Sequence, residues 1–265
     1  MKYYYPEHIS GYQRIKAEGK TAWNEIHGET GFENFSSRVF LEEALPQLRF
    51  STTNPKVLEC GCGTGPGACF LAERGFQVTG IDLIPTAIEL AKQFAKERNL
   101  DIRYQVQDVC ELSHEGEEYD MIVDSYCLQG IVTDRDREKV FSAIRARLKP
   151  EGYYLVSTAM FHKHEFSEDR VVDAETGIVY NRYGKDMFIN TQTSIVYEVL
   201  EGSPDDYEDA IRITGTWYLP HRRHRKPPAL RAELGAAGFR VLYQSGEEGG
   251  NAICIVGGST ANLSL

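Results

Sequence analysis

The sequence has 265 residues, of which 42% are hydrophobic and 26% are charged, and its formal net charge is −10. This length allows one α/β domain with additions, or two small domains. The negative charge disfavours broad nucleic-acid binding, and no apolar run approaches the length of a membrane span. The first residues lack a signal-peptide pattern and the six cysteines lack zinc-site spacing, so we expect free thiols in a cytoplasmic protein.

The first 50 residues precede the first predicted strand and are rich in Tyr, Phe and Glu. Apolar spacing predicts helical turns over Ser10–Ala17 and Thr21–Ile26, and a longer helix capped by Ser36 or Ser37. We expect this segment to form a helical cover over the rest of the chain. Its aromatic side chains would either pack on the sheet or lie near a ligand pocket; they include Tyr12, Trp23 and Phe35.

The segment Lys56–Gly67, KVLECGCGTGPG, has the order strand, glycine turn, helix start. Val57 and Leu58 form a short apolar run that is typical of a buried parallel strand. Glu59 ends this run, and glycines follow at alternate positions, namely Gly61, Gly63, Gly65 and Gly67. Glycine adopts backbone angles that are closed to other residues and lets a ligand approach the main chain. Turns of this kind commonly bind nucleotides.

Two cofactor classes fit a glycine turn, and a turn with no ligand is a third interpretation. The dinucleotide fingerprint G-x-G-x-x-A matches Gly63, Gly65 and Ala68. However, Glu59 would repel a pyrophosphate at the helix N-terminus. Its carboxylate suits a ligand with an ammonium and a sulfonium group, and S-adenosylmethionine (SAM) carries both. The pattern Glu59-x-Gly61-x-Gly63-x-Gly65 resembles motif I of class I SAM-dependent methyltransferases of the small-molecule type.

Acidic residues follow three later strands, predicted at Phe76–Ile81, Asp101–Val106 and Tyr119–Val123. Asp82 ends the first of these and suits a ribose diol. The resemblance implies that Asp108 accepts a hydrogen bond from the adenine amino group. The cofactor residues expected from the turn, the strand ends and the resemblance are Trp23, Glu59, Gly61, Cys62, Gly63, Gly65, Asp82, Leu83, Asp108, Val109, Asp124 and Ser125.

Alternating strands and helices from Lys56 to Met160 predict an α/β fold with a doubly wound, Rossmann-like, mostly parallel sheet. A β-rich insert over 161–226 interrupts this alternation, and it is too long for a plain connection. We expect an antiparallel sheet or set of hairpins that binds substrate or closes over it. A helix at Pro227–Ala237 and strands at Phe239–Gln244 and Ala252–Val256 complete the domain, which would span 51–265.

Methyl transfer mainly requires that the acceptor is held in line and that water is excluded; a base is needed only when the acceptor must lose a proton. Many small-molecule relatives have a Leu-His pair after the fourth strand, where this sequence has Leu128-Gln129. We expect no resident metal. The candidate catalytic residues are Tyr126, His162, His164 and His221.

The expected acceptor is a small molecule and not a nucleic acid, a membrane or a large protein. The run His221–Lys226 is locally basic. If it faces the pocket, the acceptor should carry a carboxylate or phosphate; if it faces solvent, a neutral aromatic or amine acceptor is expected. Two alternatives stay open: a SAM-binding scaffold without turnover, and an NAD-linked oxidoreductase. A homodimer is compatible with this interpretation.

Overall fold

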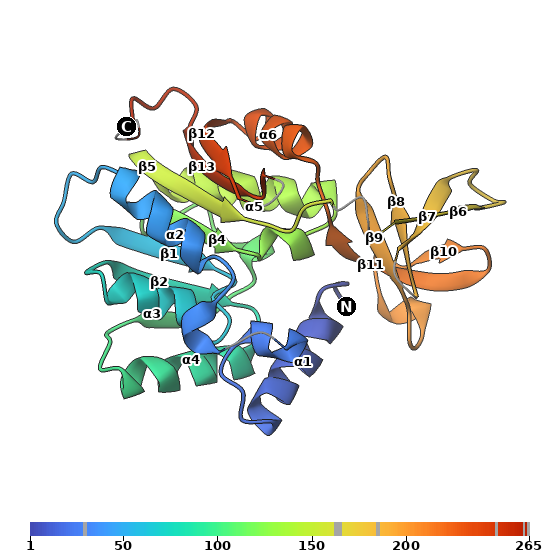
Figure 1. The fold of residues 1–265 in the computed structure, drawn as a ribbon, viewed down its shortest axis with the longest axis horizontal. Coiled ribbons are helices and arrows are strands. Elements are labelled where there is room, and N and C mark those ends of the chain that lie inside the picture. Colours follow the sequence, from blue (N-terminus) through green and yellow to red (C-terminus); the bar gives the residue numbers. More distant parts are fainter. Residues whose placement is uncertain (29–30, 162–165, 184–185, 247–248, 262, 264–265) are drawn as a thin grey trace.

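The computed structural model describes residues 1–28, 31–161, 166–183, 186–246, 249–261 and 263. Two sheets organise these residues (Figure 1). The larger sheet has seven strands, in the order β12-β13-β5-β4-β1-β2-β3. Its strands are β1 (Lys56–Cys60), β2 (Gln77–Asp82), β3 (Arg103–Val106), β4 (Tyr119–Ser125), β5 (Leu148–Ser157), β12 (Phe239–Ser245) and β13 (Asn251–Val256).

The pairing of this sheet is parallel from β5 through β4, β1 and β2 to β3, whereas β13 is antiparallel to both of its neighbours. The chain moves outward from β1 to β3 and then returns to β4 on the other side of β1. Ligands of open α/β sheets bind outside the carboxyl ends of the strands at such a switch point. The predicted mostly parallel, Rossmann-like sheet is confirmed.

Helices cover both faces of the central sheet, because β1 presents Val57 to one face and Leu58 to the other. Val57 packs in a cluster with residues of α2, α3 and α4, and Leu58 in a cluster with residues of α5 and α6. Among the described residues, no helix has both the length and the apolar character needed to cross a bilayer. The α-helices are α1 (Tyr5–Ala17), α2 (Arg38–Ala44), α3 (Pro66–Ala72), α4 (Pro85–Glu97), α5 (Asp134–Arg147) and α6 (Pro227–Ala236). Short 3-10 helices are η1 (Trp23–His27), η2 (Phe32–Asn34), η3 (Leu45–Gln47), η4 (Val109–Glu111), η5 (Leu128–Gly130) and η7 (Pro204–Asp206).

The second sheet confirms the predicted antiparallel, β-rich insert. Its order is β10-β11-β9-β8-β7-β6, and it lies to one side of the central sheet (Figure 1). The Thr214 N–H donates to Asp173 Oδ2 at 3.0 Å, so the turn between β10 and β11 lies close to the end of β6. The sheet therefore curls around a small core of its own that includes Tyr180, Phe188 and Tyr218. Its strands are β6 (Phe166–Val172), β7 (Val179–Tyr183), β8 (Met187–Asn190), β9 (Ile195–Val199), β10 (Ile211–Ile213) and β11 (Thr216–Arg223).

Three local predictions were wrong. Helix α1 begins at Tyr5, ahead of the predicted Ser10, because Pro6 fits the first turn of a helix. Ser37 precedes α2 but makes no side-chain cap, since its hydroxyl donates to Ser125 Oγ at 2.8 Å. Strand β5 starts at Leu148, so the predicted turn at 150–152 lies within a strand whose pairing with β4 is irregular.

Candidate functional site

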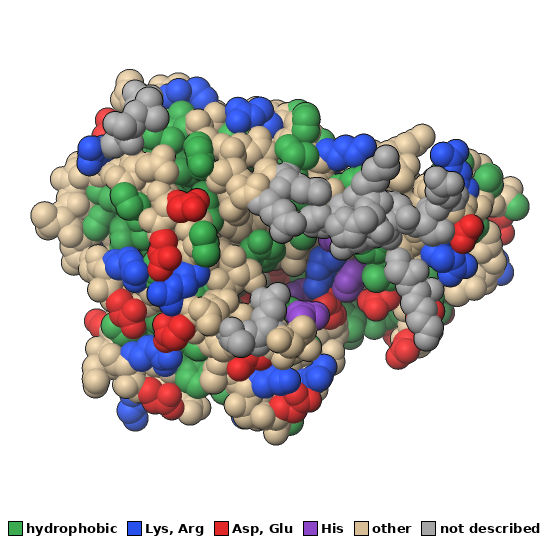
Figure 2. Space-filling view, in the orientation of Figure 1, with side chains coloured by type: hydrophobic (Ala, Val, Ile, Leu, Met, Phe, Trp, Pro, Cys, Tyr) green, Lys and Arg blue, Asp and Glu red, His purple; other side chains and the backbone are tan. Residues whose placement is uncertain are grey.

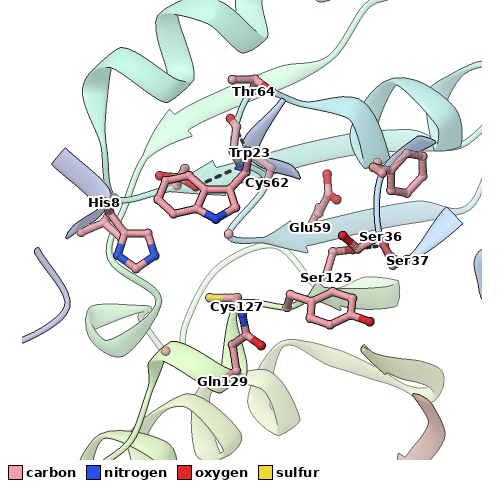
Figure 3. A pocket seen from close by; sticks show the side chains of 18 of the residues that line it. His8, Trp23, Ser36, Ser37, Glu59, Cys62, Thr64, Ser125, Cys127 and Gln129 are labelled. Atoms are coloured by element: carbon pink, nitrogen blue, oxygen red, sulfur yellow. Dashed lines mark hydrogen bonds between the residues drawn. The ribbon is translucent and has the colours of Figure 1, made fainter. Parts of the chain in front are cut away.

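A cavity lies at the carboxyl ends of the parallel strands, between the glycine turn and the N-terminal segment (Figure 3). The central sheet, α1, the segment before α2, and β11 all contribute to its wall. Its lining residues are Tyr4, His8, Tyr12, Ala22, Trp23, Asn24, Phe35, Ser36, Ser37, Glu59, Gly61, Cys62, Gly63, Thr64, Pro66, Gly67, Asp82, Leu83, Asp108, Val109, Ser125, Tyr126, Cys127, Gln129, Gly130, Ile131 and Arg222.

The glycine turn is packed against protein atoms as well as the cavity. Gly61 and Gly63 have positive φ angles of +65° and +56°, a region that side chains other than glycine rarely adopt. A Cβ on Gly61 would lie 2.7 Å from Cys127 Cβ, and one on Gly63 would lie 2.8 Å from the Tyr12 hydroxyl. The turn therefore needs glycine for the fold itself, in addition to any ligand.

Glu59 is buried beneath the turn, with 1% of its surface exposed. Burial raises its pKa to about 8, although hydrogen bonds from the Ala68 N–H and the Ser125 hydroxyl oppose the shift. Its Oε2 has no hydrogen-bond partner in the described structure. A buried carboxyl oxygen without a partner is costly, and a cation in the cavity would satisfy it. Glu59 therefore fits the ammonium-bearing end of SAM.

Asp82 and Asp108 are both held in place by backbone N–H groups. Asp82 accepts hydrogen bonds from Gly63 N and Ile84 N, each at 2.9 Å. Asp108 accepts from Cys110 N at 2.9 Å and from the Tyr4 hydroxyl at 2.8 Å. A carboxylate oxygen can accept more than one hydrogen bond, so both side chains retain acceptor capacity toward the cavity.

Helix α1 and η1 form the cover of the cavity with aromatic side chains. The rings of His8 and Trp23 stack with centroids 5.3 Å apart, and Trp23 also packs on Tyr12 at 5.0 Å. His8 Nδ1 lies 2.6 Å from the Tyr4 carbonyl oxygen. This contact requires Nδ1 to donate, which leaves Nε2 as a hydrogen-bond acceptor in a neutral imidazole.

All but two of the predicted cofactor residues line this cavity; the exceptions are Gly65 and Asp124. Gly65 lies against the Tyr104 side chain, because a Cβ at this position would be only 2.4 Å from the Tyr104 hydroxyl. Asp124 is buried and accepts hydrogen bonds from Cys127 N and Leu128 N, so it shapes the loop after β4. Burial raises its pKa to about 7.

Of the predicted catalytic residues, Tyr126 lines the cavity, and it does so from a left-handed backbone conformation with φ of 63°. His221 does not line it; its Nδ1 lies 3.3 Å from a Glu198 carboxylate oxygen, and burial together with Arg222 lowers its pKa to about 4. His162 and His164 lie outside the described residues.

The sequence interpretation missed Tyr4 and His8 as site residues. Both lie on the N-terminal segment, far in sequence from the strands whose ends they cover. The triplet of tyrosines followed by Pro6 and the lone His8 carries no motif. The available signal was the cluster of aromatic residues ahead of the first strand.

The arginines of the predicted basic run form ion pairs with carboxylates of the same chain. Arg223 Nη1 pairs with Asp134, and Arg225 Nη2 pairs with Glu233 at 3.1 Å. Arg222 lines the cavity, but both of its terminal nitrogens bond to Glu7. Among the described residues of this run, Arg222 thus faces the cavity with its charge already paired, whereas Arg223 and Arg225 pair elsewhere.

Residues 57–152 match the family described as a methyltransferase domain. Over 102 residues the chain is 33% identical to a ubiquinone biosynthesis O-methyltransferase of Coxiella burnetii, which covers 38% of this chain and 42% of that protein. Over 128 residues it is 30% identical to the 2-heptyl-1-hydroxyquinolin-4(1H)-one methyltransferase of Mycobacteroides abscessus, covering 48% and 55%. The chain thus spans about half the length of these curated relatives.

The fold is also similar to solved structures. A SAM-dependent methyltransferase from Clostridium acetobutylicum superposes with a TM-score of 0.60 at 16% identity, over 93% of this chain and 99% of the other. The complex of DhpI with S-adenosylhomocysteine superposes with a TM-score of 0.58 at 18% identity, over 95% and 96%. The chain therefore shares the fold of a SAM-dependent methyltransferase, and residues 57–152 match a methyltransferase domain.

Proposed function

We propose that this protein transfers a methyl group from SAM to a small-molecule acceptor. The observation that carries the proposal is the unpaired, buried Oε2 of Glu59 under a glycine turn, at the switch point of a parallel sheet. The similarity of residues 57–152 to methyltransferase domains supports it. A pyrophosphate fits this position poorly because Glu59, Asp82 and Asp108 all present carboxyl groups to the cavity.

The residues present fit SAM from end to end. Glu59 and the backbone of the glycine turn would hold the amino-acid end, Asp82 the ribose and Asp108 the adenine amino group. When bound, SAM would supply a methyl group activated by a sulfonium: the acceptor atom bonds to the methyl carbon in line as the carbon–sulfur bond breaks, and S-adenosylhomocysteine is the leaving group. The cover formed by α1 and η1, with Tyr12 and Trp23, would exclude water from this space, which favours the displacement.

We assign the acceptor to the class of neutral small molecules with an aromatic or amine character. Arg222, from the basic run, lines the cavity, and its guanidinium is already paired with the Glu7 carboxylate. The wall is rich in aromatic side chains, including Tyr4, Phe35 and Tyr126, which suit a planar acceptor. The named relatives are a ubiquinone biosynthesis O-methyltransferase and a hydroxyquinolinone methyltransferase.

All six cysteines are free thiols, which supports a reducing, cytoplasmic location. Within the described residues, no group of three or more His, Cys, Asp or Glu side chains is placed to hold a metal ion.

The test is calorimetry with S-adenosylhomocysteine, followed by incorporation of labelled methyl from SAM into pools of neutral aromatic and anionic acceptors. Binding followed by label in the neutral pool is the expected result. The absence of binding at millimolar ligand, with a folded sample, contradicts the proposal. Binding without label in any pool would favour the SAM-binding scaffold, and label confined to anionic acceptors would overturn the assigned acceptor class.

A further inference from the structure

A partly buried ion pair joins the N-terminal helix to the β-rich insert. Arg222 Nη1 donates to Glu7 Oε2 at 2.7 Å and Nη2 donates to Oε1 at 2.6 Å. The two residues are 215 positions apart in sequence, on α1 and β11. Such a bidentate pair, with two parallel charged hydrogen bonds to one carboxylate, is both stronger and more directional than a single hydrogen bond.

The Arg222 end of this pair lies at the wall of the cofactor cavity, and the Glu7 side chain is 32% exposed. The Arg222 side chain is 12% exposed and lines the cavity together with residues of the glycine turn. Figure 2 shows histidine side chains beside acidic and basic ones in the hollow between the two sheets. Burial by itself would raise the pKa of Glu7, but Arg222 and His221 outweigh it and lower the pKa to about 2. Glu7 is therefore ionised at neutral pH.

Helix α1 docks through a narrow apolar stripe, in which Tyr12 and Ile15 pack in a cluster with Ile84 and Ala87. Of its thirteen residues only Tyr12 and Ile15 are buried, and most of the others are polar. Yet the helix carries His8 and Tyr12 over the glycine turn and Asp82. Polar contacts with the insert add to this narrow apolar stripe in setting the position of α1.

We propose that Glu7 and Arg222 form a positioning pair that holds α1 closed over the cofactor, so that cofactor retention depends on the β-rich insert. This inference rests on the proposed function, since it concerns the same cavity. It predicts that a change on β11, in the insert, alters the affinity for a ligand bound by the central sheet. The charges act through α1 and do not touch the reacting atoms.

The test combines Glu7→Gln, Arg222→Gln and the exchanged pair Glu7→Arg with Arg222→Glu. Each single variant should weaken S-adenosylhomocysteine binding about tenfold or more in calorimetry, as expected for loss of a charged hydrogen-bond partner. The exchanged pair should recover part of this loss. In the ligand-free protein, amide hydrogen exchange over residues 5–17 should accelerate in the single variants and not over the central sheet.

The matched control is Lys2→Ala. Lys2 pairs with Glu208 at 3.2 Å, so it also joins the N-terminus to the insert, but it lies outside the cavity wall. It should leave affinity and exchange unchanged. Unchanged affinity in the Glu7 and Arg222 variants, with or without faster exchange, overturns the inference. If the wild-type protein binds no S-adenosylhomocysteine, the proposed function fails, and exchange over 5–17 still decides whether the pair holds α1.

Discussion

Burial favours the protonated form of Glu59, whereas a bound ammonium group would favour the ionised form. It has no partner at Oε2, and its pKa of about 8 means that it is mostly protonated in the ligand-free protein at neutral pH. An acid whose pKa is raised by folding stabilises the folded state fully below its unfolded pKa, and this contribution is lost as the pH rises through the folded value. The ligand-free protein therefore loses stability from about pH 4.5 to about pH 8 through this group.

Glu59→Gln should reduce this loss and also weaken cofactor binding. The amide cannot ionise, so the decrease in the free energy of unfolding between pH 5 and pH 9 should become smaller, by up to ~1.4 kcal/mol per pH unit in that window. Urea unfolding across the pH series measures this. S-adenosylhomocysteine affinity should fall roughly tenfold or more. Glu43→Gln, at an exposed position, serves as the control, and an unchanged pH dependence in the Glu59 variant would contradict the argument.

His8 supplies a proton acceptor that the loop after β4 lacks. Its Nδ1 is committed to the Tyr4 carbonyl, so Nε2 keeps its lone pair, and a Cβ on Gly130 in that loop would lie 3.8 Å from the His8 ring. With an acceptor that must lose a proton, His8→Asn should lower kcat on the order of 10²-fold.

The control for His8 is His114→Asn, since His114 is exposed and hydrogen-bonded to Ser142. It should leave the rate unchanged. A His8 variant that loses affinity for the cofactor but keeps kcat would show that the ring acts in binding alone.

At the scale of elements, helix α3 depends on the absence of a side chain at Gly67. Alanine is normally favoured over glycine within a helix by about 1 kcal/mol. Here a Cβ on Gly67 would lie 2.1 Å from Glu59 Oε1, and the glutamate is confined by burial. The helix can therefore approach β1 only because this position is glycine.

Gly67→Ala should destabilise the protein by roughly 1–3 kcal/mol, the usual cost of overpacking. In a Glu59→Ala background the obstacle is gone, so the same substitution should become neutral or stabilising. Chemical denaturation of the four proteins of this cycle measures the coupling. Gly235→Ala in α6 is the control, because its Cβ would meet nothing within 4 Å and it should stabilise by about 0.5–1 kcal/mol. Equal effects of Gly67→Ala in both backgrounds would refute the contact.

Sequence patterns predicted the elements whose contacts are local or periodic. Val57 and Leu58 identified a buried strand, and Glu59 with its glycines located the cavity before any pairing was known. The pattern could not supply the partner of Arg222, because Glu7 lies 215 residues away and the pairing depends on how two sheets sit against α1. Likewise, no local sequence pattern in the insert predicts that its strands curl around Phe188.

At the scale of the whole molecule, the protein has a central sheet and a curled insert sheet with separate cores. The insert also contacts the N-terminal segment, through Arg222 with Glu7 and through the Asp206 carbonyl with the N-terminal amine. Two side chains of the insert, Ile195 and Leu219, also pack against the central core. Since α1 covers the cavity of one sheet and is held by the other, the insert is expected to influence the cofactor site through α1.

Phe188→Ala tests this relationship. Phe188 is buried in the insert core, with its ring centroid 5.5 Å from that of Tyr218, so its removal should cost about 3–5 kcal/mol within the insert. Hydrogen exchange should accelerate over β6 to β11 and then over α1, while β1 and β4 keep their protection. S-adenosylhomocysteine affinity should fall as α1 loosens. Val179→Ala, at a 43% exposed position on β7, should change none of these. Faster exchange in the insert with α1 and affinity unchanged would show that the two sheets act independently.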